Sequence, residues 1–158
     1  MVKDEIKREL SPLLGKPLTF MFRAAGIQAF EFGQQRPAVN RKGEAVSKGD
    51  WRINARCDWS IRGPAGVIVS SADFGPGRER RDDSAAWFYE GLSRAEWRAV
   101  SLGACDDGQL AIELSGGFHV EFWFDPNNGD PNGEQWRFFR EVREGTHPVV
   151  GLAGLERV

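Results

Sequence analysis

The stretch WRINARCDWSIRG, residues 51–63, alternates apolar and polar side chains over most of its length. Successive side chains of a β-strand point to opposite faces, so this pattern predicts a strand with one buried face. The apolar positions are Trp51, Ile53, Ala55, Cys57, Trp59 and Ile61, and the polar positions are Arg52, Asn54, Arg56, Asp58, Ser60 and Arg62. Further alternations follow between residues 100 and 124, which favours antiparallel sheets as the basis of the fold.

The hydrophobic pattern also selects how these later strands pair. A three-residue loop at 115–117 sets Leu114 opposite Phe118 and Ile112 opposite Val120, which keeps one face of the hairpin apolar. A two-residue turn would mix apolar and polar residues on the same face. The same test predicts a three-residue loop at 106–108 and places Leu102 opposite Ile112.

A fourth strand is predicted beyond the connection DPNNGDPNGEQ. Phe124 can face Trp136 and Phe122 can face Phe138, which extends the hairpins into a four-strand antiparallel meander. In this arrangement Arg137 lies opposite Trp123.

The N-terminal half contains a helix, strands and a long polar segment. The spacing of Ile6, Leu10, Leu13 and Leu14 predicts a short helix that Pro12 can break. Strands are expected at 17–25 and 27–33, and loops at 33–50 and 72–83. A second helix is expected within 84–97. We therefore predict one α+β domain, residues 1–158, with a bent antiparallel sheet or two sheets of seven or eight strands and one or two packed helices.

Composition narrows the classes of function. The 158 residues carry a formal net charge of −2, which argues against the strong basic field of a duplex-binding protein, so nucleic acid is an unlikely partner. The charged N-terminus MVKDEIKREL does not resemble a signal peptide, and no apolar run has the length of a membrane span. We expect a cytoplasmic protein with reduced thiols.

Cys57 and the polar row of its strand are the first candidates for chemistry. Cys57 lies on the apolar side, where a buried thiol packs rather than reacts. The outward residues Arg52, Arg56 and Arg62 could receive an acidic partner or a phosphate. Alternatively they pair with glutamates of neighbouring strands on a solvated face, where ion pairs contribute little stability.

His119 is the second candidate, because the predicted register surrounds it with carboxylates. Glu113 lies opposite on one side, Glu141 on the other if the fourth strand pairs as above, and Glu121 two residues along. Such a histidine could bind a metal or act as a base with a raised pKa. Cross-strand Glu–His–Glu contacts also stabilise ordinary surfaces.

No metal or cofactor is expected. The only other histidine, His147, lies in a terminal loop, whereas zinc sites need several His or Cys ligands. The loop from Asp125 has Gly129 and Asp130 where a calcium loop requires an oxygen ligand and a glycine. The chain also lacks GxSxG, HExxH, Walker and GxGxxG motifs, so we expect no catalytic residues.

Trp123 raises a different possibility, because an exposed tryptophan can stack on a sugar ring. A cation–π pair with Arg137 would explain the same residue without a ligand.

Four segments resemble a bacterial family of uncharacterised proteins: LLGKPL, WRINARCDWSI, LAIELSGGFHVEFWFD, and EQWRFF followed by HPVV. Members carry an LLGxP segment, a W-R-I…C-x-W strand, an L-E-L-S-G-G hairpin and a late W-R-F. The likeness spans most of the chain, although the two long loops differ. The family has no assigned activity, so the resemblance implies no functional residue. Small α+β bacterial proteins of this kind often serve as immunity or accessory proteins of toxin systems.

We therefore expect a non-catalytic cytoplasmic module that binds another protein, in one form a toxin-neutralising immunity protein. The alternative is a small-ligand or carbohydrate-binding β-rich domain, and a metal-assisted enzyme at Glu113 and His119 comes third. The sequence leaves the partner and the oligomeric state open.

Overall fold

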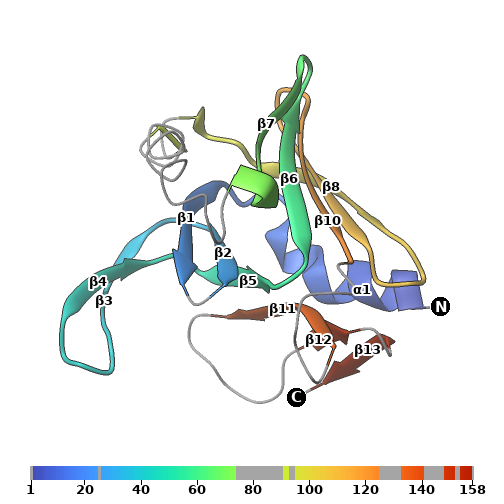
Figure 1. Cartoon of the computed structure of the whole chain (residues 1–158). Coiled ribbons are helices and arrows are strands. Elements are labelled where there is room, and N and C mark those ends of the chain that lie inside the picture. Colours follow the sequence, from blue (N-terminus) through green and yellow to red (C-terminus); the bar gives the residue numbers. More distant parts are fainter. Residues whose placement is uncertain are drawn as a thin grey trace.

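The computed structural model describes residues 2–24, 26–73, 91–92, 95–124, 133–140, 148–151 and 154–157. Within them the chain forms an N-terminal helix and three antiparallel sheets, shown in Figure 1. The six-stranded sheet has the order β1(Leu18–Ala24), β2(Ile27–Phe32), β5(Trp51–Ala55), β11(Glu134–Arg140), β12(Pro148–Gly151), β13(Gly154–Arg157). The five-stranded sheet has the order β7(Gly66–Ser70), β6(Asp58–Gly63), β10(Phe118–Trp123), β9(Leu110–Leu114), β8(Ala99–Ala104).

The third sheet is a two-stranded ribbon formed by β3(Arg36–Val39) and β4(Ala45–Lys48). The α+β class with antiparallel sheets is confirmed, but the described residues contain thirteen strands rather than seven or eight. Two of the additional strands form this ribbon, in a segment expected to be a loop, one comes from the division of residues 51–63, and β12 and β13 are the other two.

The helix α1(Val2–Leu10) follows the predicted apolar stripe. Ile6 and Leu10 are buried, and a 3₁₀ turn η1(Ser11–Leu13) takes over at Pro12 and buries Leu13. The proline ring restricts the preceding residue, which accounts for the change of helix type. Leu14, which the spacing placed on the same apolar side, is exposed. The helix packs mainly against β8.

Residues 51–63 pass from one sheet to the other. The N–H groups of Arg56 and Cys57 both donate to the carbonyl of Gln135, at 2.8 and 3.1 Å, so two residues face one in a β-bulge. The bulge ends β5 in the six-stranded sheet and lets β6 begin in the five-stranded sheet. The prediction of one continuous strand is therefore wrong.

The predicted burial of the apolar row is confirmed despite the bulge. Five of its members are buried, and Trp51 is partly buried against the same core. The five are Ile53, Ala55, Cys57, Trp59 and Ile61.

The predicted hairpin registers between β8, β9 and β10 are confirmed. Leu114 pairs with Phe118, Ile112 with Val120, and Leu102 with Ile112. Here the loop lengths and the apolar pattern were enough to determine the pairing.

The predicted fourth strand of the meander is wrong. The second neighbour of β10 is β6, which sets Phe122 opposite Trp59 instead of Phe138. Strand β11 lies between β5 and β12 in the other sheet, with Trp136 opposite Ala55. The indole N–H of Trp136 donates to the carbonyl of Gly108 at 2.9 Å, so the strand remains tied to the β8–β9 turn.

The second predicted helix falls largely outside the described residues, of which 91–92 and 95 are helical. The same is true of most of the loop at 72–83, apart from the 3₁₀ turn η2(Ser71–Asp73), and of the loop beginning at Asp125. No helix in the described part of the chain is long and apolar enough to cross a membrane.

The main core lies between the inner faces of the two large sheets. Phe30 of β2 makes edge-to-face contacts with Trp59 of β6 and Phe122 of β10, each with ring centroids 5.1 Å apart. Ile6 and Leu10 of α1 belong to the same buried cluster. Because the inner face of the five-stranded sheet packs in this core, its other face points away from the core.

The burial of Cys57 gives a direct test of the fold. Cys57 is 4 % exposed, Cys105 is exposed, and neither forms a disulfide. A maleimide should therefore label one thiol in the native protein and two in the unfolded protein. Cys57→Ser should lower the free energy of unfolding by about 1–3 kcal/mol, because a hydroxyl is costlier to bury than a thiol. Rapid native labelling of Cys57, located by peptide mass spectrometry, would contradict this packing.

Candidate functional site

The three arginines of the polar row do not form one surface. Arg52 belongs to β5 in the six-stranded sheet, Arg56 lies at the bulge, and Arg62 belongs to β6 in the five-stranded sheet. The sequence alternation placed them all on the outward side, but the change of sheet separates them.

Arg52 is mostly covered by the protein rather than presented to solvent. Its side chain is 14 % exposed and lies over the rings of Phe22 and Phe139, with 4.9 and 5.6 Å from Cζ to the centroids. Its Nη2 donates to Oε2 of Glu31 at 2.9 Å, and the other carboxylate oxygen accepts the N–H of Gly49 at 2.8 Å. Arg52 therefore links β5 to β2, and its partner Glu31 holds Gly49 at the end of the ribbon.

The other arginines pair with glutamates of neighbouring strands, as the alternative explanation of the row predicts. Arg56 lies 3.1 Å from Glu134 of β11, and Arg62 lies 4.0 Å from Glu121 of β10. Arg137 also donates to Glu134, through Nε at 3.0 Å. The Arg62 pair is long and exposed, so it compensates the charge of Glu121 weakly.

His119 has Glu113 and Glu121 as predicted, but not the predicted residue on its other side. Glu113 lies opposite on β9, but the residue opposite on β6 is Arg62, because β11 is not the neighbour of β10. Glu141 lies outside the described residues. The Glu113 carboxylate accepts the hydroxyl of Ser101 at 2.6 Å. In the part of the chain that the structure describes, no three His, Cys, Asp or Glu side chains are grouped to hold a metal ion.

The predicted pair of Trp123 and Arg137 is wrong. Trp123 lies opposite Asp58 in the five-stranded sheet, and Arg137 lies opposite Asn54 in the six-stranded sheet. A cation–π contact with Arg137 therefore does not account for the exposed indole.

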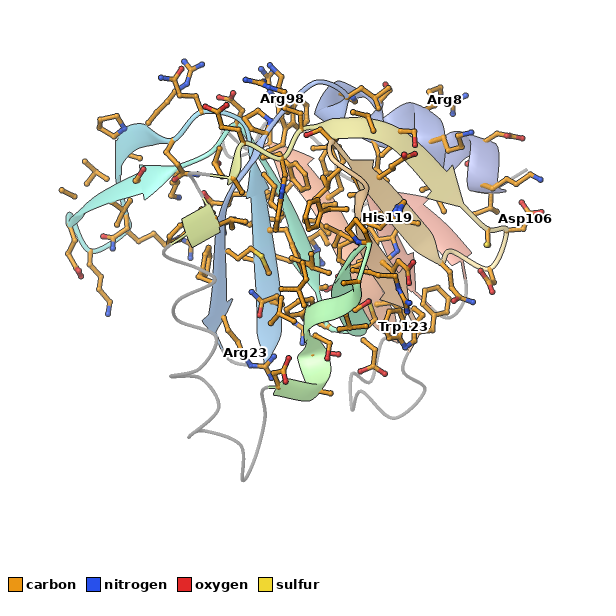
Figure 2. The ribbon with its side chains drawn as sticks, turned by 90° about the horizontal axis from the view of Figure 1, so that it is seen from above. Arg8, Arg23, Arg98, Asp106, His119 and Trp123 are labelled. Carbon is orange, nitrogen blue, oxygen red and sulfur yellow. The ribbon has the colours of Figure 1, made fainter. Side chains whose placement is uncertain are left out.

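Trp123 instead borders a groove on the outer face of the five-stranded sheet, with a volume of about 340 Å³. The outward residues that line it are Gly103, Cys105, Gln109, Ala111, Glu121 and Trp123, and we call this set the sheet groove. Gly103 pairs with Ala111, and Ala111 pairs with Glu121, so two small residues lie in one cross-strand row beside the carboxylate. Figure 2 labels Trp123 and His119, which both belong to β10; of the two, Trp123 lines the groove.

The end of the groove is held by a local network. The side chain of Gln109 donates to Oδ2 of Asp107 at 2.8 Å, and its backbone N–H donates to Oδ1 at 3.0 Å. The bond from the Gln109 N–H, with that from its side chain, lowers the pKa of Asp107. The network fixes Gln109 beside the groove.

The ribbon, residues 36–48, is a second feature, and it leaves the body of the protein on the opposite side from Trp123 (Figures 1 and 2). Oδ1 of Asn40 accepts the N–H groups of Lys42 and Glu44, each at 2.9 Å, and Gly43 adopts a φ of +80°. This is a three-residue hairpin with glycine in the left-handed position. Val39 is 69 % exposed, so the ribbon is not part of the core.

A cavity of about 580 Å³ lies at the root of the ribbon. Its charged lining residues are three basic and two acidic ones: Lys16, Arg36, Arg98, Asp50 and Glu96. Arg36 lies 3.3 Å from Asp50, and Arg98 donates to the carbonyl of Gly15 at 3.0 Å. The cavity joins the base of the ribbon to the turn after α1.

No family model, curated protein or solved structure matches this chain. The assignment of function therefore rests on its own surfaces.

Reasoning from the sequence missed both features. The ribbon could have been recognised from AVNRKGEAV, where two short apolar pairs flank Asn40 and Gly43. For the sheet groove, the signal was the predicted register itself, because it aligns Gly103 and Ala111 beside Glu121.

Proposed function

We propose that this chain is a non-catalytic binding module that contacts another protein through the ribbon. The observation that carries the proposal is an ordered hairpin that projects from the body and contributes nothing to the main core. A two-stranded ribbon gains little stability by itself. A turn held by the Asn40 side chain on such a ribbon is easier to explain by recognition than by folding.

The charges of the ribbon point to an acidic partner. Four basic side chains, Arg36, Arg41, Lys42 and Lys48, accompany one acidic side chain, Glu44. Arg41 and Lys42 are both exposed at the tip. Opposite charge on a partner would accelerate association and favour one orientation of the complex.

The ribbon also offers backbone groups for recognition. In the sheets of the described residues, β3 and β4 have only each other as strand neighbours. Strand edges of this kind accept an added strand from a partner, with main-chain hydrogen bonds supplying affinity. The cavity at the root of the ribbon would adjoin such a contact.

The test compares the ribbon tip with a matched charge change elsewhere. A partner is first captured from native lysate with the wild-type protein, identified and purified, and its affinity is then measured by calorimetry. Arg41→Gln combined with Lys42→Gln should weaken binding about tenfold or more and reduce its salt dependence. Both side chains are exposed, so the melting temperature should not change.

The control is Lys7→Gln combined with Arg8→Gln, which removes the same charge from the exposed side of α1. It should bind the partner as the wild type does. Equal weakening by both double variants would show a general charge effect, and no weakening by the tip variant would overturn the proposal. Toxin neutralisation is one form that such binding can take, and a toxin gene beside this one would favour it.

A further inference from the structure

We infer that the sheet groove binds a small organic cation, at a site separate from the ribbon. The inference rests on the glycine in the lining of the groove, the charge of Glu121 and the exposed indole of Trp123.

The backbone does not require Gly103 to be glycine. Its φ is outside the left-handed region, and an added Cβ would come no closer than 3.8 Å to another atom. Glycine in the interior of a strand costs stability, and it often marks a place where a ligand approaches the backbone closely. Ala111, its partner on β9, keeps the floor low on the next strand.

The groove carries a negative charge that the protein compensates weakly. Glu121 lines it, and the cation paired with this carboxylate in the structure is Arg62, at 4.0 Å. Asp58 lies opposite Trp123 and accepts a hydrogen bond from Ser71 at 3.1 Å. A positive ligand is therefore favoured over a negative one, since attraction increases as water is excluded from the groove.

Trp123 supplies the second half of the recognition. Trp123 is 36 % exposed, so its indole is accessible to a ligand in the groove. The face of tryptophan attracts a cation more strongly than that of any other aromatic side chain. A carboxylate and an indole on one strand, two residues apart, form a site suited to an ammonium group.

The size of the groove limits the ligand. A volume of about 340 Å³ lies at the lower end of the range for small-molecule sites. It suits a single ammonium-bearing group, either on a free amine or at the end of a lysine side chain. The two sources share the same chemistry and can be distinguished by the probe.

Cys105 provides the readout, because this exposed thiol lines the groove whereas Cys57 is buried. The rate of maleimide labelling is measured with and without choline. A dissociation constant of about 1 mM would slow labelling about tenfold at about 10 mM choline. The neutral isostere 3,3-dimethylbutanol should give little protection. Nα-acetyl-lysinamide, tested in parallel, reports whether a lysine side chain is accepted as well as a free quaternary amine.

Three variants connect the protection to the residues named. Gly103→Val adds a branched side chain to the floor, with its Cβ 3.8 Å from Ala111, Glu121→Gln removes the charge, and Trp123→Ala removes the ring. Each should abolish protection by choline while the native fold is retained. Glu113→Gln, on the same face but outside the lining, is the matched control and should remain protected.

The outcomes that overturn the inference are distinct. Equal protection by the neutral isostere would show an apolar site, and better protection by glucose would show a sugar site. Absence of protection by both choline and Nα-acetyl-lysinamide at about 10 mM would show that the groove binds no small cation. None of these results depends on the ribbon.

Discussion

Arg52→Gln is expected to lower the free energy of unfolding by about 3–5 kcal/mol, because it leaves the buried carboxylate of Glu31 without its cation. The expected loss also includes the contacts that the Arg52 side chain makes with the rings of Phe22 and Phe139. Equilibrium unfolding in urea measures it. The sequence alternation by itself suggested that Arg52 lies on a solvated face. Replacing an arginine there would lower the free energy of unfolding far less.

Two further variants separate burial from charge. Arg62→Gln removes an exposed arginine from the other sheet and should change the free energy of unfolding by less than about 1 kcal/mol. Replacing both Arg52 and Glu31 by Met should recover part of the loss, since no unpaired charge then remains buried, while the N–H of Gly49 loses its acceptor. Equal, small effects of Arg52→Gln and Arg62→Gln would contradict the buried cross-link.

Phe30→Ala should also cost about 3–5 kcal/mol of unfolding free energy. Phe30 is fully buried, and its ring contacts Trp59 and Phe122 of the opposite sheet. The substitution leaves a cavity at the point where the two large sheets meet, so the loss includes contacts on both sides. Thermal and urea unfolding with the same variant should give consistent values.

Phe20→Ala is the matched control on the neighbouring strand. Phe20 is 41 % exposed, and its nearest ring contact is Phe22 of its own strand, with centroids 5.9 Å apart. The loss should be about 1 kcal/mol or less, in proportion to the smaller apolar area buried. If Phe30→Ala cost no more than Phe20→Ala, the two sheets would not pack as described.

The sequence was most informative where strands are joined by short turns. The loops at 106–108 and 115–117 leave few registers, and only one keeps the apolar residues of β8, β9 and β10 on one face. The burial of Cys57 and its apolar neighbours follows from the same alternation. These features depend on residues close in the chain.

The position of β11 could not be predicted from the alternation of apolar and polar residues. Its apolar residues Trp136 and Phe138 would lie on the buried face of the sheet equally well whether β11 paired with β10 or, as it does, with β5. Alternation determines the face of a strand but not its neighbour when the connection is long. The predicted surroundings of two candidate residues were wrong for this reason. Arg62 lies beside His119, and Arg137 does not lie opposite Trp123.

By itself, the sequence determined the helix at the N-terminus, the antiparallel hairpins and the division of residues 51–63 into a buried and an outward row. Only the tertiary structure decided that this stretch changes sheets at Arg56 and Cys57, that most of the Arg52 side chain is covered, and that Gly103, Glu121 and Trp123 border one groove. The physical reason is the range of the interactions. Side-chain direction and turn length are set by neighbouring residues, whereas strand neighbours are chosen by packing among segments that lie far apart in the chain.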